Sequence, residues 1–345
     1  MRPIRLAVLV APALLVALLL APSTWAQPLV AFDLPTYLNA GNSPVSVATG
    51  DFNGDDDPAL AVANRFSSDV SVLLGGPDDS FTGPTSFPTG FFSNSVAVGD
   101  FDADQDPDLA VANAGDGTVS VLLGDGGGGF SGPTNLATDG FPYVVVAGDF
   151  NQDGDSDLVV ADHVLGNLSM LVGGPGDRFS GPTTVASGTG TAAVAVGEFN
   201  QDGDPDLAVA EESGQVRVLL GSIGGGFAAP TAVLSGSQVQ GGLSSVAVGD
   251  FNLDGDPDLV VGHRSGNQVR VLLGRPGGSF GAPTDVPTST LPASVAVADV
   301  NADGKPDLTT AHPTTHNVAV LVNTTVTNGP RRRTRTPTAP PRTPP

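Results

Sequence analysis

Closely spaced carboxylates are the most evident chemistry in this sequence. The segment DFNQDGDSDL, residues 149–158, contains four aspartates and an asparagine, with a glycine at its sixth position. Carboxylates at this spacing repel one another unless a cation lies among them. Calcium takes about six to eight oxygen ligands, often from acidic side chains at alternate positions of a tight loop in which a glycine permits the turn. The segment therefore predicts a calcium-binding loop.

The acidic segment occurs six times along the chain. Its copies begin at residues 51, 100, 149, 198, 250 and 299, at spacings of 49, 49, 49, 52 and 49 residues. In this register, positions one, three, five and nine carry side-chain oxygens, and the backbone carbonyl at position seven, that of Asp155 in the third copy, adds a further ligand. The predicted calcium ligands are Asp51, Asn53 and Asp55; Asp100, Asp102, Asp104 and Asp108; Asp149, Asn151, Asp153 and Asp157; Glu198, Asn200, Asp202 and Asp206; Asp250, Asn252, Asp254 and Asp258; and Asp299, Asn301, Asp303 and Asp307.

Two copies depart from the pattern. The second has Gln105 in place of the glycine, and the first has Asp56 there and Ala59 in place of the position-nine carboxylate. We therefore expect the first site to bind calcium most weakly. The six loops hold 24 of the 36 acidic residues, so most of the negative charge belongs to these sites rather than to a general solvated surface. In the alternative interpretation, the Asp and Asn residues form turns and bind nothing.

Four short segments of β-type composition accompany each loop. In the second copy they are residues 95–99, 108–112, 118–123 and 130–137, with the acidic loop between the first two. The first three are rich in Val, Leu and Ala, as expected for strands that are covered on both faces. A four-stranded unit of about 40–50 residues that recurs this often is typical of a β-propeller. The sequence predicts an all-β fold with six four-stranded blades.

The two ends of the repeat region predict how the ring closes. Residues 31–38, AFDLPTYL, resemble a fourth strand with no unit before it, and residues 317–323, NVAVLVN, are a third strand with no fourth after it. We expect the N-terminal strand to pair with the last blade and complete it. Seven blades is the alternative, which requires a degenerate copy that the sequence does not show.

The repeat resembles a known family. The residues FGAP occur at 280–283, and the variants FTGP, FSGP, FSGP and FAAP occupy the same place in other copies. Together with the DxDxDGxxD loop, they are similar to the FG-GAP (VCBS) repeat of integrin α-chain propellers and of many bacterial secreted proteins. The resemblance extends over about residues 29–324, and it implies calcium loops on one face and ligand contact on the other. Integrin propellers carry a seventh blade, so their ligand specificity is not transferred.

The terminal segments differ in composition from the repeats. Residues 1–26 have two early arginines, an apolar stretch and small residues before Ala26, which predicts a secretory signal; an uncleaved membrane anchor is the alternative. Residues 27–324 form the predicted propeller, without a later segment that is apolar enough to cross a membrane. Residues 325–345 are rich in Pro, Thr and Arg and predict a disordered tail, whose arginines could also contact an acidic polymer. We expect a protein that is secreted or held at the cell surface.

The loops opposite the acidic segments offer candidate ligand residues. Phe91 and Phe92 lie in one loop after a fourth strand, and Phe141 and Tyr143 lie in the next. Exposed together, they would form a contact patch, but they could equally pack between blades. Six polar residues end the second strands. The two histidines among them are further candidates for the ligand face. In the alternative interpretation, all six cap strand ends in water. These residues are Asn64, Asn113, Asp162, Glu211, His263 and His312.

The composition favours binding over catalysis. There is no cysteine and only four histidines, and the dense carboxylate clusters are assigned to calcium. The net charge of −22 disfavours nucleic acid as a partner. We expect a monomeric, non-enzymatic recognition or adhesion module with an unknown protein or glycan ligand. A lectin is the first alternative, although the only tryptophan lies within the predicted signal, and an enzyme is the second.

Overall fold

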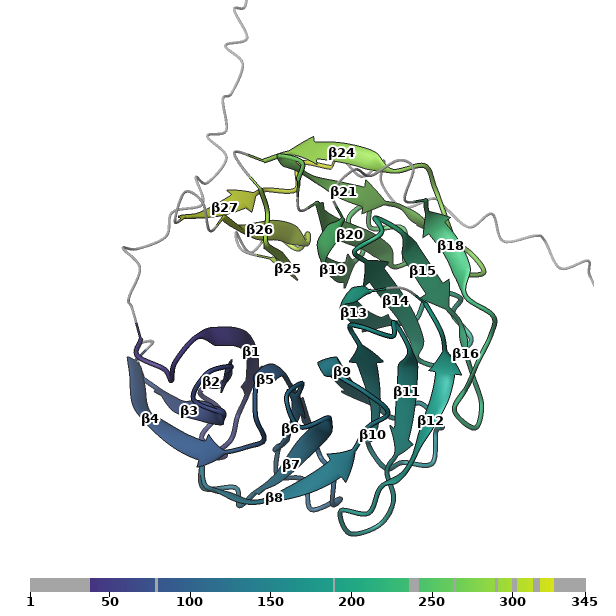
Figure 1. Ribbon diagram of the computed structural model, residues 1–345. Coiled ribbons are helices and arrows are strands. Elements are labelled where there is room, and N and C mark those ends of the chain that lie inside the picture. The colour runs from purple at the N-terminus through teal and green to yellow at the C-terminus, as the bar shows by residue number, and fades with distance from the viewer. Residues whose placement is uncertain are drawn as a thin grey trace, which may run out of the picture. The chain divides into compact units, whose positions relative to one another are not determined.

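The protein is a β-propeller. The computed structural model describes residues 38–77, 80–188, 190–235, 242–263, 265–288, 291–299, 303–312 and 317–325. Within these ranges the regular elements are all β-strands, which form six consecutive antiparallel blades arranged in a ring (Figure 1). The all-β, six-bladed fold predicted from the sequence is confirmed. No helix in this part of the chain is long and apolar enough to span a membrane.

Each blade is a meander in which consecutive strands pair. The first three blades consist of β1 (Pro44–Gly50), β2 (Ala59–Asn64), β3 (Asp69–Gly76) and β4 (Ser80–Pro88); β5 (Ser93–Gly99), β6 (Asp108–Asn113), β7 (Thr118–Gly124) and β8 (Phe130–Ala137); and β9 (Pro142–Gly148), β10 (Asp157–Asp162), β11 (Leu168–Val172) and β12 (Ser180–Ala186). The fourth and fifth consist of β13 (Thr191–Gly197), β14 (Asp206–Glu211), β15 (Val216–Leu219) and β18 (Thr231–Leu234); and β19 (Leu243–Gly249), β20 (Asp258–His263), β21 (Gln268–Leu272) and β24 (Thr284–Pro287).

Short hairpins extend the fourth and fifth blades. They are β16 (Gly221–Ser222) with β17 (Gly226–Phe227), and β22 (Gly274–Arg275) with β23 (Ser279–Phe280). The sixth blade contains β25 (Ser294–Ala298), β26 (Asp307–His312) and β27 (Asn317–Leu321). Residues 31–37 of the expected closing strand lie outside the described residues, as do the predicted signal at 1–26 and residues 326–345 of the predicted tail.

The core lies between adjacent blades. The second strands of the second to fifth blades are buried along their whole length, as in β6, where every residue from Asp108 to Asn113 is buried. Side chains of one blade pack on those of the next; for example, Phe52 and Val72 of the first blade share a cluster with Val96 and Leu109 of the second. Burial on both faces explains why these strands lack the apolar–polar alternation of a half-exposed sheet.

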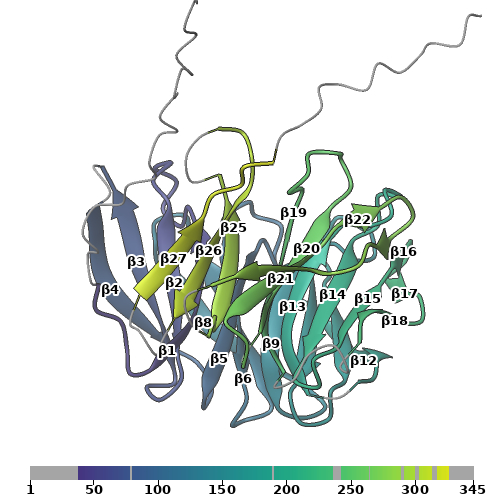
Figure 2. The same cartoon turned by 90° about the horizontal axis from the view of Figure 1, so that it is seen from above.

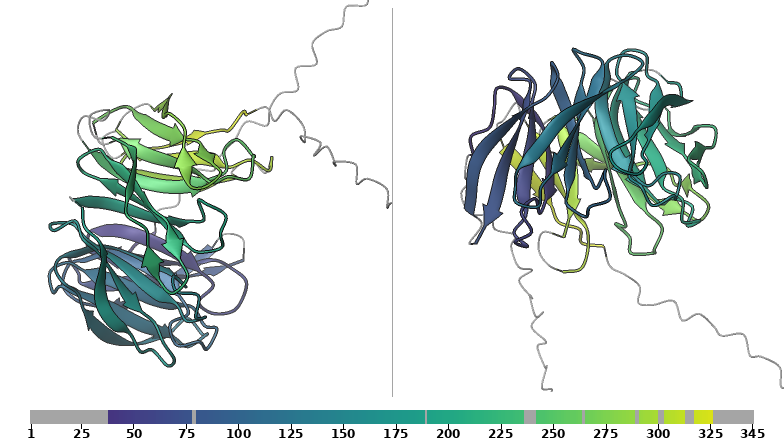
Figure 3. Two further views of the ribbon diagram at one scale, coloured as in Figure 1. Left: turned by 90° about the vertical axis from the view of Figure 1, so that its right-hand side faces the viewer. Right: turned by 90° about the horizontal axis from the view of Figure 1, so that it is seen from below.

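The meander places the loops on two faces of the ring. Because consecutive strands are antiparallel, the first-to-second and third-to-fourth connections emerge on one face, here named the acidic face. The second-to-third connections and the links between blades emerge on the other, here named the opposite face. Figures 2 and 3 show the strands running between these two faces. The acidic loops and the predicted aromatic loops therefore lie at opposite ends of the strands.

Candidate functional site

The acidic loops are curled by hydrogen bonds from their own backbone. In the third loop, Oδ1 of Asp149 accepts the Asp153 N–H at 3.1 Å, and its Oδ2 accepts the Gly154 N–H at 3.0 Å. Oδ1 of Asp153 accepts the Asp155 N–H at 2.9 Å. The same position-one to position-six bond forms in the first, second, fourth, fifth and sixth loops. The carboxylates at positions one and five are thus turned toward the inside of each loop.

The turn at position six does not depend on glycine. The glycines there have φ between 82° and 94°, and Asp56 and Gln105, which replace glycine in the first two loops, adopt the same left-handed region at 67° and 75°. A side chain in this region costs about 1–2 kcal/mol of strain. In the first loop a glycine occurs instead at position four, where Gly54 has φ 67°. All six loops therefore keep the turn that calcium loops require.

The position-nine aspartates of the second to fifth loops tie these loops to a residue at or just after the end of the third strand of the same blade. Oδ2 of Asp258 accepts the Phe251 N–H at 2.8 Å, and its Oδ1 accepts the Gly274 N–H at 2.7 Å. The same two bonds form in the second, third and fourth loops. These carboxylates are fully buried. They hold the loop in place as well as facing its interior, a role that Ala59 cannot perform in the first loop.

Burial changes the acidity of these carboxyl groups. Burial raises the pKa of Asp108 and Asp258 to about 6, although hydrogen bonds from backbone N–H groups act in the opposite direction. Burial also raises the pKa of Asp157 and Asp206. The backbone hydrogen bonds thus compensate only in part for burial of the charged form, and a cation among the loop oxygens would stabilise that form further.

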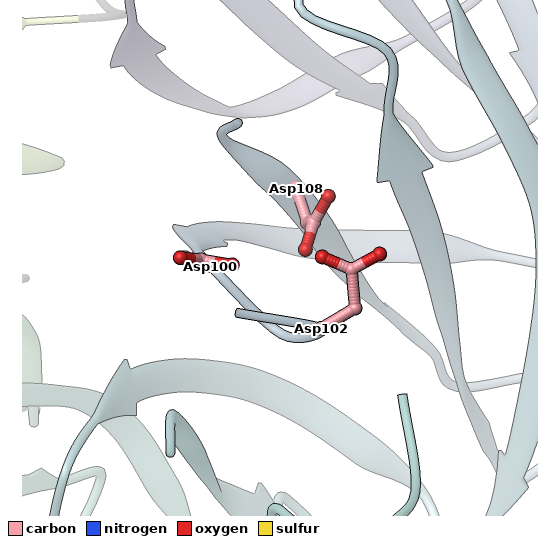
Figure 4. Close-up of side chains that lie close together, drawn as sticks. All are labelled: Asp100, Asp102 and Asp108. Atoms are coloured by element: carbon pink, nitrogen blue, oxygen red, sulfur yellow. The ribbon is translucent and has the colours of Figure 1, made fainter. Parts of the chain in front are cut away.

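The side chains at positions one, three and nine fit a hard cation. In the second loop, oxygens of Asp100, Asp102 and Asp108 all lie within 4.8 Å of one another, and Figure 4 shows Asp102 beside Asp108. In the first loop, Oδ1 of Asn53 is buried and accepts no hydrogen bond. An acceptor oxygen without a donor is what a cation ligand looks like before the cation binds. Carboxylate and amide oxygens together form the kind of ligand set that calcium prefers. Asn301, the position-three residue of the sixth loop, lies outside the described residues.

A pocket lined by aromatic residues lies on the opposite face. Its volume is about 530 Å³, and residues of the first three blades line it. Phe91 stacks on Phe92 with ring centroids 4.0 Å apart, and Tyr143 stacks on His163 at 4.6 Å. Phe141 also lines the pocket, and both Phe91 and Phe141 are about half exposed. The structure thus brings together the four aromatic residues that the sequence singled out, around a cavity rather than between blades.

A family model described as FG-GAP-like repeat matches residues 51–111, 100–160, 149–209, 198–261 and 250–310. The chain belongs to the FG-GAP repeat family. Each matched segment begins at the first residue of an acidic loop and continues through the following loop, so the family's repeat and the acidic loops coincide.

Solved structures share the fold at low sequence identity. An Agrocybe aegerita lectin, described for its specific recognition of non-reducing terminal N-acetylglucosamine, has a TM-score of 0.58 and 15% identity, over 82% of this chain and 81% of that one. The BBS1N chain in complex with ARL6DN has a TM-score of 0.53 and 13% identity, over 82% of this chain and 79% of that one. At these identities the likeness shows the fold alone. Comparison with curated proteins finds no match.

The phenylalanine of each FG-GAP motif joins two blades. Phe130, at the start of β8, packs against Phe52 in the acidic loop of the preceding blade, with ring centroids 5.5 Å apart. The same pair recurs between the second and third, third and fourth, and fourth and fifth blades, at 5.9, 6.0 and 5.6 Å. The motif and the acidic loop of this FG-GAP protein are therefore parts of one interface between neighbouring blades.

The six polar residues at the ends of the second strands are buried. Asn64 donates to Ser71 Oγ at 2.9 Å, and Asn113 donates to Ser120 Oγ at 2.8 Å. Glu211 forms an ion pair with Arg217 at 2.6 Å. His263 and His312 are 7% and 1% exposed, so they do not line the pocket. These side chains are therefore enclosed by the protein rather than placed at a rim in water or on an open ligand face.

Three polar residues of the pocket were not anticipated from the sequence. Arg65, Asn94 and His163 line the cavity together with the predicted aromatic residues. Arg65 and His163 each directly follow one of the polar residues that end a second strand, and this position is also basic at Arg264. A basic residue repeated at one repeat position was the available signal. That signal points to the pocket only once the fold is known, because the fold places the second-to-third connection of one blade beside the link to the next blade.

Proposed function

We propose that this FG-GAP propeller is a secreted or cell-surface recognition module that is stabilised by calcium and binds its ligand on the opposite face. The observation that carries the proposal is the recurrence of one cation-ready loop six times, each with inward-facing oxygens and a left-handed turn at position six. The aromatic pocket supports the second half of the proposal, since it lies at the other end of the strands from these loops.

The role proposed for calcium is structural. A bound ion would neutralise the carboxylates of a loop and cross-link the end of one strand to the start of the next. The carboxylates also accept backbone hydrogen bonds, so they are committed to holding the loop. We therefore infer a binding function without catalysis.

Glycan binding is the second candidate function. Exposed aromatic rings around a cavity offer flat apolar surfaces of the kind on which a sugar ring can stack. The lectin of similar fold recognises N-acetylglucosamine, which makes a glycan a reasonable ligand to test, although the likeness itself concerns only the fold.

The test is calorimetry of the purified protein with calcium and then with excess chelator. We expect several calcium ions per chain and a melting temperature that falls strongly on chelation, because binding to the folded state alone stabilises it. Magnesium is the matched control ion, since it requires a smaller and more regular shell and should stabilise less. The absence of calcium binding together with an unchanged melting temperature would contradict the proposal and leave the loops as turns.

A further inference from the structure

The pocket on the opposite face contains donors that no protein group satisfies. Asn94 is 8% exposed, and its side-chain nitrogen is buried without a hydrogen-bond partner. Nε of Arg65 is likewise buried and without a partner. An unsatisfied buried donor costs about 1–3 kcal/mol, so two of them beside one cavity indicate a ligand that supplies acceptors.

Arg65 gives the lining of the pocket a positive charge, whereas the chain as a whole is acidic. Outside the lining, Oε2 of Glu212 lies 3.9 Å from Nε2 of His163. No acidic residue lines the cavity, and Arg65 forms no ion pair with any residue that the structure describes. Its guanidinium lies 5.5 Å from the centre of the Phe92 ring. The neighbouring carboxylate of Asp116 accepts the Phe91 N–H at 2.6 Å and is committed to the loop. In a chain with a net charge of −22, an unpaired arginine in an acid-free cavity points to an anionic ligand.

The walls of the pocket are held in place before any ligand binds. Phe92 has φ 60°, a left-handed conformation that is uncommon and strained for an aromatic residue. The Ala114 N–H donates to the Phe92 carbonyl at 3.0 Å, and the Gly115 N–H donates to the Phe91 carbonyl at 2.8 Å. These bonds fix the stacked rings against the second blade, which lowers the entropy cost of binding.

We propose that this pocket binds the carboxylate of a six-membered sugar ring, as a hexuronic acid residue of an acidic glycan presents it. Arg65 forms an ion pair with the carboxylate, and the Asn94 side-chain nitrogen donates a hydrogen bond to a ring hydroxyl oxygen. The aromatic walls cover the apolar face of the sugar ring. The second donor favours a sugar over a purely aromatic acid, because an aromatic acid would leave the amide without an acceptor. The volume of about 530 Å³ lies within the range of small-ligand sites. The inference rests on the proposed recognition function and specifies its ligand.

The test is isothermal titration of the calcium-saturated protein with D-glucuronate and with D-glucose, which differ in the carboxylate. We expect glucuronate to bind with a Kd of about 1 mM, as suits a single small residue, and glucose to bind at least ~10-fold more weakly. Added salt should weaken the glucuronate interaction, since an ion pair contributes to it. Benzoate is the third probe, and it should bind more weakly than glucuronate.

The matched variants are Arg65→Met, Arg65→Lys and Arg178→Met. Arg178 is exposed in the third-to-fourth connection of the third blade, on the acidic face. Arg65→Met should weaken glucuronate binding by roughly 10-fold to 100-fold, the loss expected for hydrogen bonds to a charged group. Arg65→Lys should retain part of the affinity because it keeps the charge, and Arg178→Met should bind as the unmodified protein does. Melting temperatures in calcium should agree among all of them.

Several outcomes would overturn the inference. Equal binding of glucose and glucuronate, tighter binding of benzoate, unchanged affinity in Arg65→Met, or no binding of glucuronate would each do so. If calcium still raises the melting temperature in that case, the calcium-stabilised module stands without this ligand. If calcium has no effect on the melting temperature, the proposed function itself fails.

Discussion

The side chain of Gln152 donates a hydrogen bond of 2.6 Å to Oδ1 of Asp204, in the acidic loop of the next blade. The same amide nitrogen donates to the Gly203 carbonyl at 2.7 Å. Gln201 repeats the contact one blade further, to the Gly255 carbonyl at 3.0 Å and to Oδ1 of Asp256 at 2.7 Å. The acidic loops of the third, fourth and fifth blades are therefore joined in a row by side chains that are not themselves predicted ligands.

We predict that Gln152→Leu destabilises the protein and weakens calcium binding in the neighbouring loop. Each lost hydrogen bond contributes about 0.5–1.5 kcal/mol, and Gln152 positions the turn that precedes Asp204, whose backbone carbonyl is an expected ligand. Leucine suits the site, because Leu253 occupies this loop position in the fifth blade. Urea denaturation with and without calcium measures the effect.

A double-mutant cycle isolates the contact between the two blades. Gln152→Leu, Asp204→Ala and the double variant should show a coupling free energy of about 0.5 kcal/mol or more, because the residues are in direct contact. Strictly additive losses would mean that the hydrogen bond of Gln152 to Asp204 contributes nothing in solution.

Positions five and nine of one loop should separate calcium binding from folding. Asp258 is fully buried and accepts two backbone N–H groups, whereas Asp254 is exposed, so water can replace it as the acceptor for Asp256 and Asn252. We predict that Asp254→Ala removes one bound calcium and leaves stability in chelator nearly unchanged. Asp258→Ala should destabilise the protein even in chelator, by about 1–3 kcal/mol for each donor left unsatisfied. Chemical denaturation in chelator and calcium counting by calorimetry give the two readouts, and equal losses in chelator for both variants would refute the separation.

The first loop offers the reverse experiment, since it lacks the position-nine carboxylate. Phe52 and Gly75 occupy the places whose N–H groups bind that carboxylate in the other blades. We predict that Ala59→Asp raises the calcium affinity of the first loop and the melting temperature in calcium. In chelator the gain should be smaller than in calcium, because the new carboxylate is buried without a cation even though backbone N–H groups can bond to it. An equal gain in calcium and in chelator would show that the carboxylate acts through hydrogen bonds alone.

The repeated features of this protein could be predicted from the sequence because they depend on local spacing. Short apolar strands separated by acidic loops at a period of 49 residues are sufficient to predict six blades. The curled loops follow in the same way, since Asp149 bonds to residues only four and five positions further on. Even there, the ability of Asp56 and Gln105 to take the left-handed turn was visible only in the structure.

The features that the sequence did not reveal depend on distances between blades. Gln152 and Asp204 are 52 residues apart, and nothing in either loop alone indicates their contact. Arg65 and Tyr143 meet at one pocket because three blades lie side by side. The polar residues that end the second strands also suggested an exposed ligand face, which was wrong: His312, for example, is buried and forms a hydrogen bond with Thr310 of its own strand.

The aromatic pairs between blades lead to a further expectation about how the ring closes. Phe251, in the fifth acidic loop, borders a cavity of about 430 Å³ that is also lined by Leu273, Leu308 and Leu321. In the sequence, Phe32 precedes Asp51 by 19 residues, the same interval that separates the FG-GAP phenylalanines Phe81, Phe130 and Phe179 from the acidic loops that follow them. Residue 32 lies outside the described residues. If residues 31–38 complete the sixth blade, as the sequence predicts, Phe32 is by its register the FG-GAP phenylalanine of that blade, the counterpart of Phe130 in the second.

We therefore predict that Phe32→Ala destabilises the protein about as much as Phe130→Ala does, by roughly 3–5 kcal/mol, the usual loss for a buried phenylalanine. Phe66→Ala is the matched control, because Phe66 is 58% exposed on the opposite face and should cost little. Urea denaturation in calcium compares the three variants at equal protein concentration. If Phe32→Ala behaves like Phe66→Ala, the N-terminal segment does not close the sixth blade in this register, and the outer edge of β27 must be covered in another way.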